Sequence, residues 1–388
     1  MQDKECKPEK FKAFKRDSFM IPPKLEIQTL TENSARIRGP LFVCTPSFSL
    51  LPPTDPWAKE VLKTAHTDAY YKFLQEWSTN TPDEHQKDRF ICVFSRGTSS
   101  EGETTTALVE SIVRACDKDI PVLCATGPFL SREWAAAEEK KAVSGISLSF
   151  AVHGTPPEPQ QAAKLQADLE HLFCRENVAF LKEKDSATLL SLCSASALLC
   201  AFGAGLVSNV YAGGGGVSAL QSYSQNALLA TQELVNGVLS RPPGTPLPVW
   251  ASSVLYLACH SHASKEFIFG RQLDFHFKKN DALRAVFSGA THAHLSATVD
   301  GVYSLLKTHH VDSPFFDILM DAFNTHIRAS KAGEWLVKEG CVLPNEAVES
   351  ELFRRIREVD EAVHSGDNKK YDAARNKMES TFPDSVVR

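Results

Sequence analysis

Residues 189–210 read LLSLCSASALLCAFGAGLVSNV, and the chain changes character on either side of this stretch. The stretch carries no charge, and its apolar side chains are interrupted only by serine, glycine and asparagine. A helix that is hydrophobic all round must be buried, so the stretch predicts a buried helix. Since no run of about 18 uninterrupted apolar residues occurs, we expect no membrane span.

Short β-rich runs alternate with amphipathic segments before this stretch. The alternation predicts a mostly parallel sheet covered by helices on both faces, and glycine or proline follows several runs, as tight turns require. The predicted strands are residues 25–30, 41–45, 90–95, 122–125, 147–153 and 178–181, and the predicted helices are 57–77, 104–117, 133–143 and 159–173.

Helical periodicity dominates from residue 185 onward. The predicted helices are residues 187–211, 217–239, 249–262, 280–287, 295–309 and 314–337, with glycine- or proline-rich breaks at 213–216 and 241–248. We therefore expect four parts. These are a charged arm at 1–20, an α/β domain at 21–184 with an insertion at 52–88, a helical domain at 185–340 and a charged helical tail at 341–388.

The composition is that of an ordinary globular protein, with 43% hydrophobic and 23% charged residues among 388. The net charge of −5 excludes an overall basic field that would attract nucleic acid or anionic membranes. Ten cysteines without a CxxC pair fit a reducing intracellular compartment. We expect the mitochondrial matrix, with the cytoplasm as the alternative.

Two local clusters bear on partners and metals. The basic residues at 4–16 could contact RNA or an acidic protein, or could form a solvated arm. Cys259, His260 and His262 lie too close together in the sequence for a recognised zinc pattern, so we expect no metal site.

Six short motifs, in order between about residues 21 and 335, resemble those of NAD-dependent glycerol-3-phosphate dehydrogenases. Their shared order is more specific than any one of them. The resemblance implies a Rossmann-type sheet followed by a helical domain. The motifs begin at Ile21-Pro-Pro-Lys-Leu with Phe42-Val-Cys-Thr-Pro, and continue at Ser95-Arg-Gly, Gly127-Pro-Phe-Leu-Ser-Arg-Glu, Cys193-Ser-Ala-Ser-Ala-Leu with Gly203-Ala-Gly, Ser264-Lys-Glu-Phe-Ile-Phe-Gly, and Val311-Asp-Ser-Pro.

The dinucleotide fingerprint of that family is missing. Its GxGxxG turn aims a helix N-terminus at the pyrophosphate, and this sequence contains no such motif. The glycine run at 213–216 lies between two predicted helices and reads as a turn. The resemblance starts at about Ile21, where the family has already completed its first βαβ unit. We therefore expect a partial sheet that lacks this unit, and no bound cofactor.

The proton-transfer groups are missing as well. The resemblance places the family's catalytic lysine at Ala197 and its aspartate at Val254. Residues 186–264 contain no lysine or aspartate, and their only charges besides histidine are Glu233 and Arg241. Reduction of a ketone needs a proton carrier at its oxygen. The sequence therefore predicts no catalytic residue.

Some anion-binding capacity could survive. The resemblance replaces the family's second lysine by Arg96, which keeps the charge but cannot exchange a proton near neutral pH. It also places Lys265 and Glu266 at the family's phosphate-binding pair, which puts a carboxylate where the phosphate should lie. Arg96, Lys265 and Arg271 could hold an anion or a partner, or could form ordinary structural ion pairs.

These observations favour a catalytically inactive relative of the family that acts as a structural or scaffold subunit of a larger assembly. A divergent mitochondrial ribosome or a respiratory complex would fit. We expect protein partners, with RNA as a further possibility through the basic arm, and no small-molecule substrate. One alternative is an active glycerol-3-phosphate dehydrogenase that reduces dihydroxyacetone phosphate. The other is a small-ligand sensor that uses the interdomain cleft.

Overall fold

The structure is a computed structural model, and its two compact units are described separately. Unit 1 comprises residues 1–45, 49–95 and 105–190, and unit 2 comprises residues 46–48, 96–104 and 191–388. The structure describes residues 40–44, 68–81, 89–128, 146–154, 157–173, 177–211, 216–262, 264–273, 289–324, 326–338 and 368–381, with 355, 358, 359 and 362. The expected arm at 1–20, the strand at 25–30 and the helices at 133–143 and 280–287 lie outside these residues.

Unit 1 is built on a five-stranded sheet whose strands follow one another in sequence order. The strands are β1 (Leu41–Val43), β2 (Ile91–Val93), β3 (Val122–Thr126), β4 (Ser147–Val152) and β5 (Asn177–Leu181). Every neighbouring pair is parallel except β3 with β4. The predicted mostly parallel sheet is confirmed. The single antiparallel pair puts the carboxyl ends of β4 and β5 at the opposite end of the sheet from those of β1–β3.

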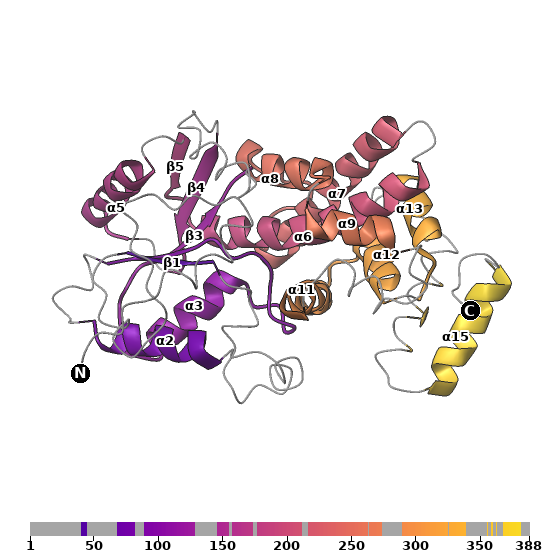
Figure 1. Cartoon of the computed structure of the whole chain (residues 1–388), viewed down its shortest axis with the longest axis horizontal. Helices are drawn as coiled ribbons and strands as arrows, with labels where there is room; N and C mark the ends of the chain where they lie inside the picture. Colours follow the sequence, from indigo (N-terminus) through magenta and orange to yellow (C-terminus); the bar gives the residue numbers. More distant parts are fainter. Residues whose placement is uncertain are drawn as a thin grey trace, which may run out of the picture. The chain divides into compact units, whose positions relative to one another are not determined.

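Helices cover both faces of this sheet (Figure 1). Helix α5 (Pro159–Leu172) packs Leu165 and Leu169 against one face, in a cluster with Leu123 and Phe150. Helices α2 (Asp68–Thr79) and α3 (Thr105–Arg114) pack together on the other face. Strands β2 and β3 are buried along their whole length, as expected for strands covered on both sides.

The β1 edge of the sheet carries an aromatic patch. Among the described strands β1 pairs only with β2, and its Phe42 keeps 40% of its surface exposed. The Phe42 ring lies 6.3 Å from that of Phe94 and 6.1 Å from that of Phe173, measured between centroids. We call Phe42, Phe94 and Phe173 the edge aromatic patch. Phe42 therefore leaves exposed apolar surface at the β1 edge of the sheet.

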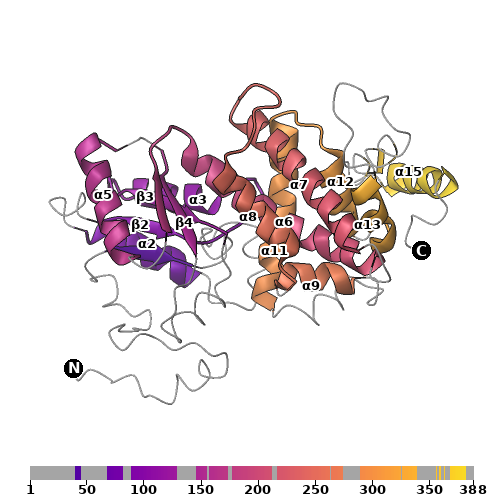
Figure 2. The same cartoon turned by 90° about the horizontal axis from the view of Figure 1, so that it is seen from above.

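Unit 2 is helical, and α6 lies in the middle of its helices (Figure 2). In chain order the helices are α6 (Ser186–Val210), α7 (Gly216–Val238), α8 (Val249–His260), α9 (Lys265–Gln272), α11 (Gly289–Thr308), α12 (Pro314–Phe323), α13 (Ala329–Lys338) and α15 (Asn368–Thr381). Helix α6 begins in unit 1, since the division between the units falls after Leu190.

The single helix predicted at 314–337 is wrong, because the chain breaks between α12 and α13. The backbone N–H of His326 donates to the carbonyl of Asp321 at 2.8 Å. The same histidine places its Nδ1 2.9 Å from Asp321 Oδ1. These contacts fold the chain back after Asn324, which ends α12. Both helices bury apolar side chains, so the helical spacing of apolar residues continues across the break. The spacing alone therefore does not reveal where α12 ends.

Helix α6 is the core of unit 2. By length and composition it could cross a membrane, but its most apolar window is wholly buried inside the protein. Its Phe202 stacks on Phe269 of α9 at 5.4 Å between centroids. Its Cys200 carbonyl accepts a hydrogen bond of 2.7 Å from the hydroxyl of Tyr223 on α7. The prediction of a helix buried on all sides is confirmed.

Two glycines set the crossing of α6 and α9. A methyl group added at Gly205 would overlap the carbonyl oxygen of Phe267 and come within 2.7 Å of the Arg271 nitrogen. A methyl group added at Gly270 would overlap the carbonyl oxygen of Phe202. Backbone faces backbone at this point, so no side chain can rotate away to make room.

We predict that Gly205→Ala destabilises the protein by about 1–3 kcal/mol, because an added methyl group forces the two helices apart. This loss exceeds the gain of about 1 kcal/mol in helix propensity. Gly237→Ala in α7 is the matched control, since its new methyl group meets only the Val311 side chain. Urea unfolding at neutral pH measures both. Equal stabilities for the two variants would contradict the close crossing.

Candidate functional site

Ala197 and Val254, where the resemblance places the family's lysine and aspartate, lie in the apolar interior of unit 2. Ala197 keeps 1% of its surface exposed and Val254 keeps 3%. Cys193 and Cys200 lie four residues before and three residues after Ala197, on the same face of α6. The Cys200 thiol sits beside that of Cys259 on α8, and this contact, together with burial, raises its pKa well above the ordinary value. Protonated thiols in such surroundings behave as small apolar groups.

Arg96 lies at the start of a loop, residues 96–104, that packs within unit 2. Gly97 has a φ of +97°, and an added Cβ would come within 2.6 Å of Thr298 Oγ1 and 2.7 Å of His294 Cε1. From the other side, an added Cβ at Gly301 of α11 would overlap Thr98 and the Ser99 carbonyl. The loop and α11 are therefore in close backbone contact, and this contact fixes where Arg96 can reach.

A half-buried charge cluster forms around Arg96. Burial lowers the pKa of Arg96, and the nearby Glu266 carboxylate opposes that shift. Burial raises the pKa of Glu266, against its own backbone hydrogen bond and the charges of Arg96 and Lys265. Burial, with a smaller effect from Arg96, lowers the pKa of His294 to about 4. At neutral pH the cluster therefore holds the Arg96 guanidinium cation and a neutral His294 imidazole beside the Glu266 carboxyl group.

Helix α9 positions Glu266. The hydroxyl of Ser264 accepts a 3.1 Å hydrogen bond from the Phe267 N–H and caps the helix. This cap puts Glu266 in the first turn, where a carboxylate is favoured by the helix dipole. Lys265 and Arg271 are exposed on α9. Since they are six residues apart, they lie on different faces of the helix. The structure thus joins Glu266 to Arg96 but does not gather the three predicted cations.

His294 is the member of the cluster that the sequence did not single out. It belongs to none of the motifs or clusters quoted from the sequence. The available signal was its spacing, because His294, Thr298 and Gly301 follow one face of α11 at helical intervals. That face contacts the loop, but only the structure identifies the loop as its neighbour.

Glu233, the only carboxylate between residues 186 and 264, faces a second acid. It is partly buried on α7, and burial together with the Asp312 carboxylate raises its pKa to about 7. Asp312 lies in the turn before α12, where a methyl group added at Gly237 would overlap Val311. No group of three potential metal ligands occurs among the described residues.

The architecture now defines a class. A mostly parallel sheet covered by helices and followed by a helical unit built on one buried helix is a two-domain dehydrogenase fold. No protein-family profile matches the sequence. A sequence comparison with curated proteins also finds no match. Comparison with solved structures therefore carries the assignment of the fold.

The matching structures are glycerol-3-phosphate dehydrogenases. The enzyme of Coxiella burnetii aligns with a TM-score of 0.61 at 15% identity, over 82% of this chain and 83% of that chain. Those of Plasmodium falciparum and Saccharomyces cerevisiae align with TM-scores of 0.51 and 0.50, at 10% and 13% identity. They cover 71% and 69% of this chain, and 71% and 73% of their own. The chain therefore has the fold of glycerol-3-phosphate dehydrogenases, as the motifs predicted.

We predict that the contribution of Glu233 to the free energy of unfolding falls as pH rises from about 4.5 to about 7. The reason is that Glu233 ionises at a lower pH in the unfolded chain than in the folded protein. Above pH 7 both states are ionised and this cost is fully present. Glu233→Gln should therefore stabilise the protein by about 1–2 kcal/mol at pH 8, after discounting for solvent screening, and by little at pH 4.

Denaturant unfolding at both pH values measures this difference. Asp312→Asn should give part of the same gain at pH 8, because it removes the like charge beside Glu233. Glu76→Gln on α2 controls for the loss of an exposed carboxylate. A Glu233→Gln effect that is equal at both pH values would contradict the shift.

We predict that Arg96→Met destabilises the protein by about 3 kcal/mol, because Glu266 then stays buried without its cation. Glu266→Gln should cost less, and the double variant should show a coupling of about 1 kcal/mol or more. Arg271→Met, an exposed cation on the same helix as Glu266, is the control. Unfolding by urea gives all four values, and purely additive losses would show that Arg96 and Glu266 do not interact.

Proposed function

We propose that this chain has no dehydrogenase activity and serves as a structural subunit of a larger protein assembly. The observation that carries the proposal is the apolar burial of Ala197 and Val254, the positions that correspond to the family's lysine and aspartate. Hydride transfer to a ketone requires a proton donor at the oxygen, and general acid catalysis contributes roughly 10²–10⁴ in rate. Protonated buried thiols cannot replace a lysine in that role.

The cluster around Arg96 supports the loss of activity. Arginine stays protonated at neutral pH and cannot deliver a proton. His294, whose pKa is lowered to about 4, is neutral and carries no acidic proton to donate as imidazolium. Glu266 supplies the negative charge that Arg96 would otherwise accept from a ligand. The positive charge of Arg96 therefore has a partner within the protein, in Glu266, and does not require a ligand.

The edge aromatic patch supports a role in assembly. Phe42 lies on the short strand β1, which among the described strands forms one edge of the sheet. Leu172, at the end of α5, is also exposed, at 46%. Exposed apolar side chains at a sheet edge are typical of surfaces that pair with or contact another chain. A protein partner that covers this patch would explain a fold kept without its chemistry. The mitochondrial location and an RNA partner remain predictions from the sequence.

We predict that the purified chain oxidises no NADH with dihydroxyacetone phosphate above background. The dehydrogenase of Coxiella burnetii, assayed in parallel by absorbance at pH 7, is the positive control. Turnover that rises with enzyme concentration would establish the alternative, an active dehydrogenase, and would refute the inactive assignment. Calorimetric titration with NAD should likewise give no saturable heat, because no dinucleotide fingerprint occurs in the sequence.

The assembly role has its own test, independent of activity. In native extracts the tagged full chain should elute well above its own 42.7 kDa on size exclusion. Phe42→Glu should return it to the monomer position, because it places a charge in the edge aromatic patch. Val217→Glu is the matched control at an exposed apolar residue of unit 2. Elution of the wild-type chain as a monomer would reject the proposal.

A further inference from the structure

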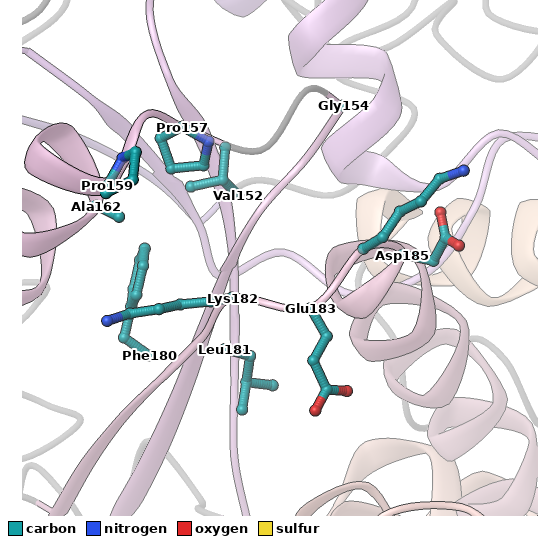
Figure 3. A pocket seen from close by; sticks show the side chains of 11 residues that line it. Val152, Gly154, Pro157, Pro159, Ala162, Phe180, Leu181, Lys182, Glu183 and Asp185 are labelled. Carbon is teal, nitrogen blue, oxygen red and sulfur yellow. The ribbon is translucent and has the colours of Figure 1, made fainter.

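A cavity of about 240 Å³ lies inside unit 1 at the carboxyl ends of β4 and β5 (Figure 3). These two strands are parallel and are joined by α5, so their carboxyl ends meet the N-terminus of that helix. Ligands of α/β proteins bind at such strand ends. Because β4 is antiparallel to β3, the cavity lies at the opposite end of the sheet from the carboxyl ends of β1–β3. It is thus a separate feature from the Arg96 cluster.

The walls of the cavity are apolar on one side and charged on the other, because Lys182, Glu183, Lys184 and Asp185 line it together with apolar residues. They come from the end of β4, the first turn of α5 and the end of β5. Phe180 belongs to the sheet face that packs against α5. The apolar residues that line the cavity on this side are Val152, Pro157, Pro159, Ala162 and Phe180. Proline and phenylalanine rings offer flat surfaces, which suit a planar apolar group.

Two lysines, Lys182 and Lys184, line the charged side of the cavity together with two carboxylates. Lys182 follows Phe180 by two residues, and residues two apart in an extended chain share a face. Figure 3 shows the Lys182 side chain beside Phe180, and the carboxylates of Glu183 and Asp185 also line the cavity. Lys184 also lines the cavity. Neither lysine forms an ion pair or hydrogen bond with another residue in the part of the chain that the structure describes. Both ammonium groups are therefore available to a ligand.

The end of α5 adds to the positive potential. Pro159 starts the helix, and Glu158 at the cap position makes no side-chain hydrogen bond to the first turn. The first-turn N–H groups therefore lack the usual side-chain acceptor, and the dipole favours an anion there. A helix end alone would select no ligand. The cavity and the two lysines supply the shape and the charge.

We propose that this cavity binds a small amphipathic anion. A phosphate or carboxylate group contacts Lys182 and Lys184, and a planar apolar group lies between Phe180 and the two prolines. The volume limits the ligand to about one ring with its anionic group, since pockets for drug-sized ligands start at about 300 Å³. The proposal goes beyond the assembly role and does not depend on it, because it concerns another part of unit 1.

Isothermal titration calorimetry of the full chain at low salt tests the proposal with phenyl phosphate, benzoate, inorganic phosphate and phenol. Phenyl phosphate or benzoate should saturate, and whichever binds more tightly identifies the anionic group. Inorganic phosphate and phenol should bind at least about tenfold more weakly, because each supplies only half of the contacts. Lys182→Gln should weaken binding by about fivefold.

Two variants separate the site from general effects. Phe180→Leu keeps the side chain apolar but removes the flat ring, so it should weaken phenyl phosphate more than inorganic phosphate. Lys338→Gln removes an exposed lysine from α13 of unit 2 and should leave binding unchanged. Equal affinities for Lys182→Gln and Lys338→Gln would overturn the proposal. So would equal binding of phenyl phosphate and inorganic phosphate, or the absence of saturation by both phenyl phosphate and benzoate. Lys182 is exposed, so its variant stays informative even if Phe180→Leu lowers stability.

Discussion

The burial of α6 on every side is the constraint on which the rest of unit 2 depends. A helix without charge has no face to offer to water, so its neighbours must cover it completely. They approach closely because small residues stand at the crossings: Gly205 meets Gly270 of α9, and Gly203 faces Tyr223 of α7. Where backbone contacts backbone, no side chain can move to accommodate a larger residue. The positions of these helices therefore follow from where α6 carries glycine.

The same constraint governs the chemistry. A lysine at position 197 would bury an ammonium group beside cysteine thiols, at a cost of several kcal/mol unless an anion accompanied it. The chain places no anion there, and Val254 stands where the resemblance expects one. Arg96 is a half-buried cation of unit 2, and the Glu266 carboxyl group lies near it. An apolar centre and a self-neutralised charge cluster are consistent with a fold that is retained for its surfaces.

Unit 1 owes its two exposed features to the sheet. At the β1 edge, Phe42 has only β2 beside it among the described strands, so the edge aromatic patch stays open to contact. At the other side of the sheet, the reversal at β4 brings the ends of β4 and β5 together with the start of α5. Without that reversal, Phe180 and Lys182 would lie at the same end of the sheet as the carboxyl ends of β1–β3.

Local patterns in the sequence determined the strand positions of unit 1, the burial of α6 and the lack of lysine and aspartate at residues 186–264, because period, apolarity and charge are properties of neighbouring residues. Tertiary structure alone decided the direction of β4, since a two-residue alternation reads the same in either direction. It also broke the apolar run at 314–337, where His326 turns back to Asp321. Burial and Asp312 raise the pKa of Glu233, and Glu266 opposes the effect of burial on the pKa of Arg96, although each partner is distant in sequence. Electrostatic energy depends on distance in space, and the sequence does not contain that distance.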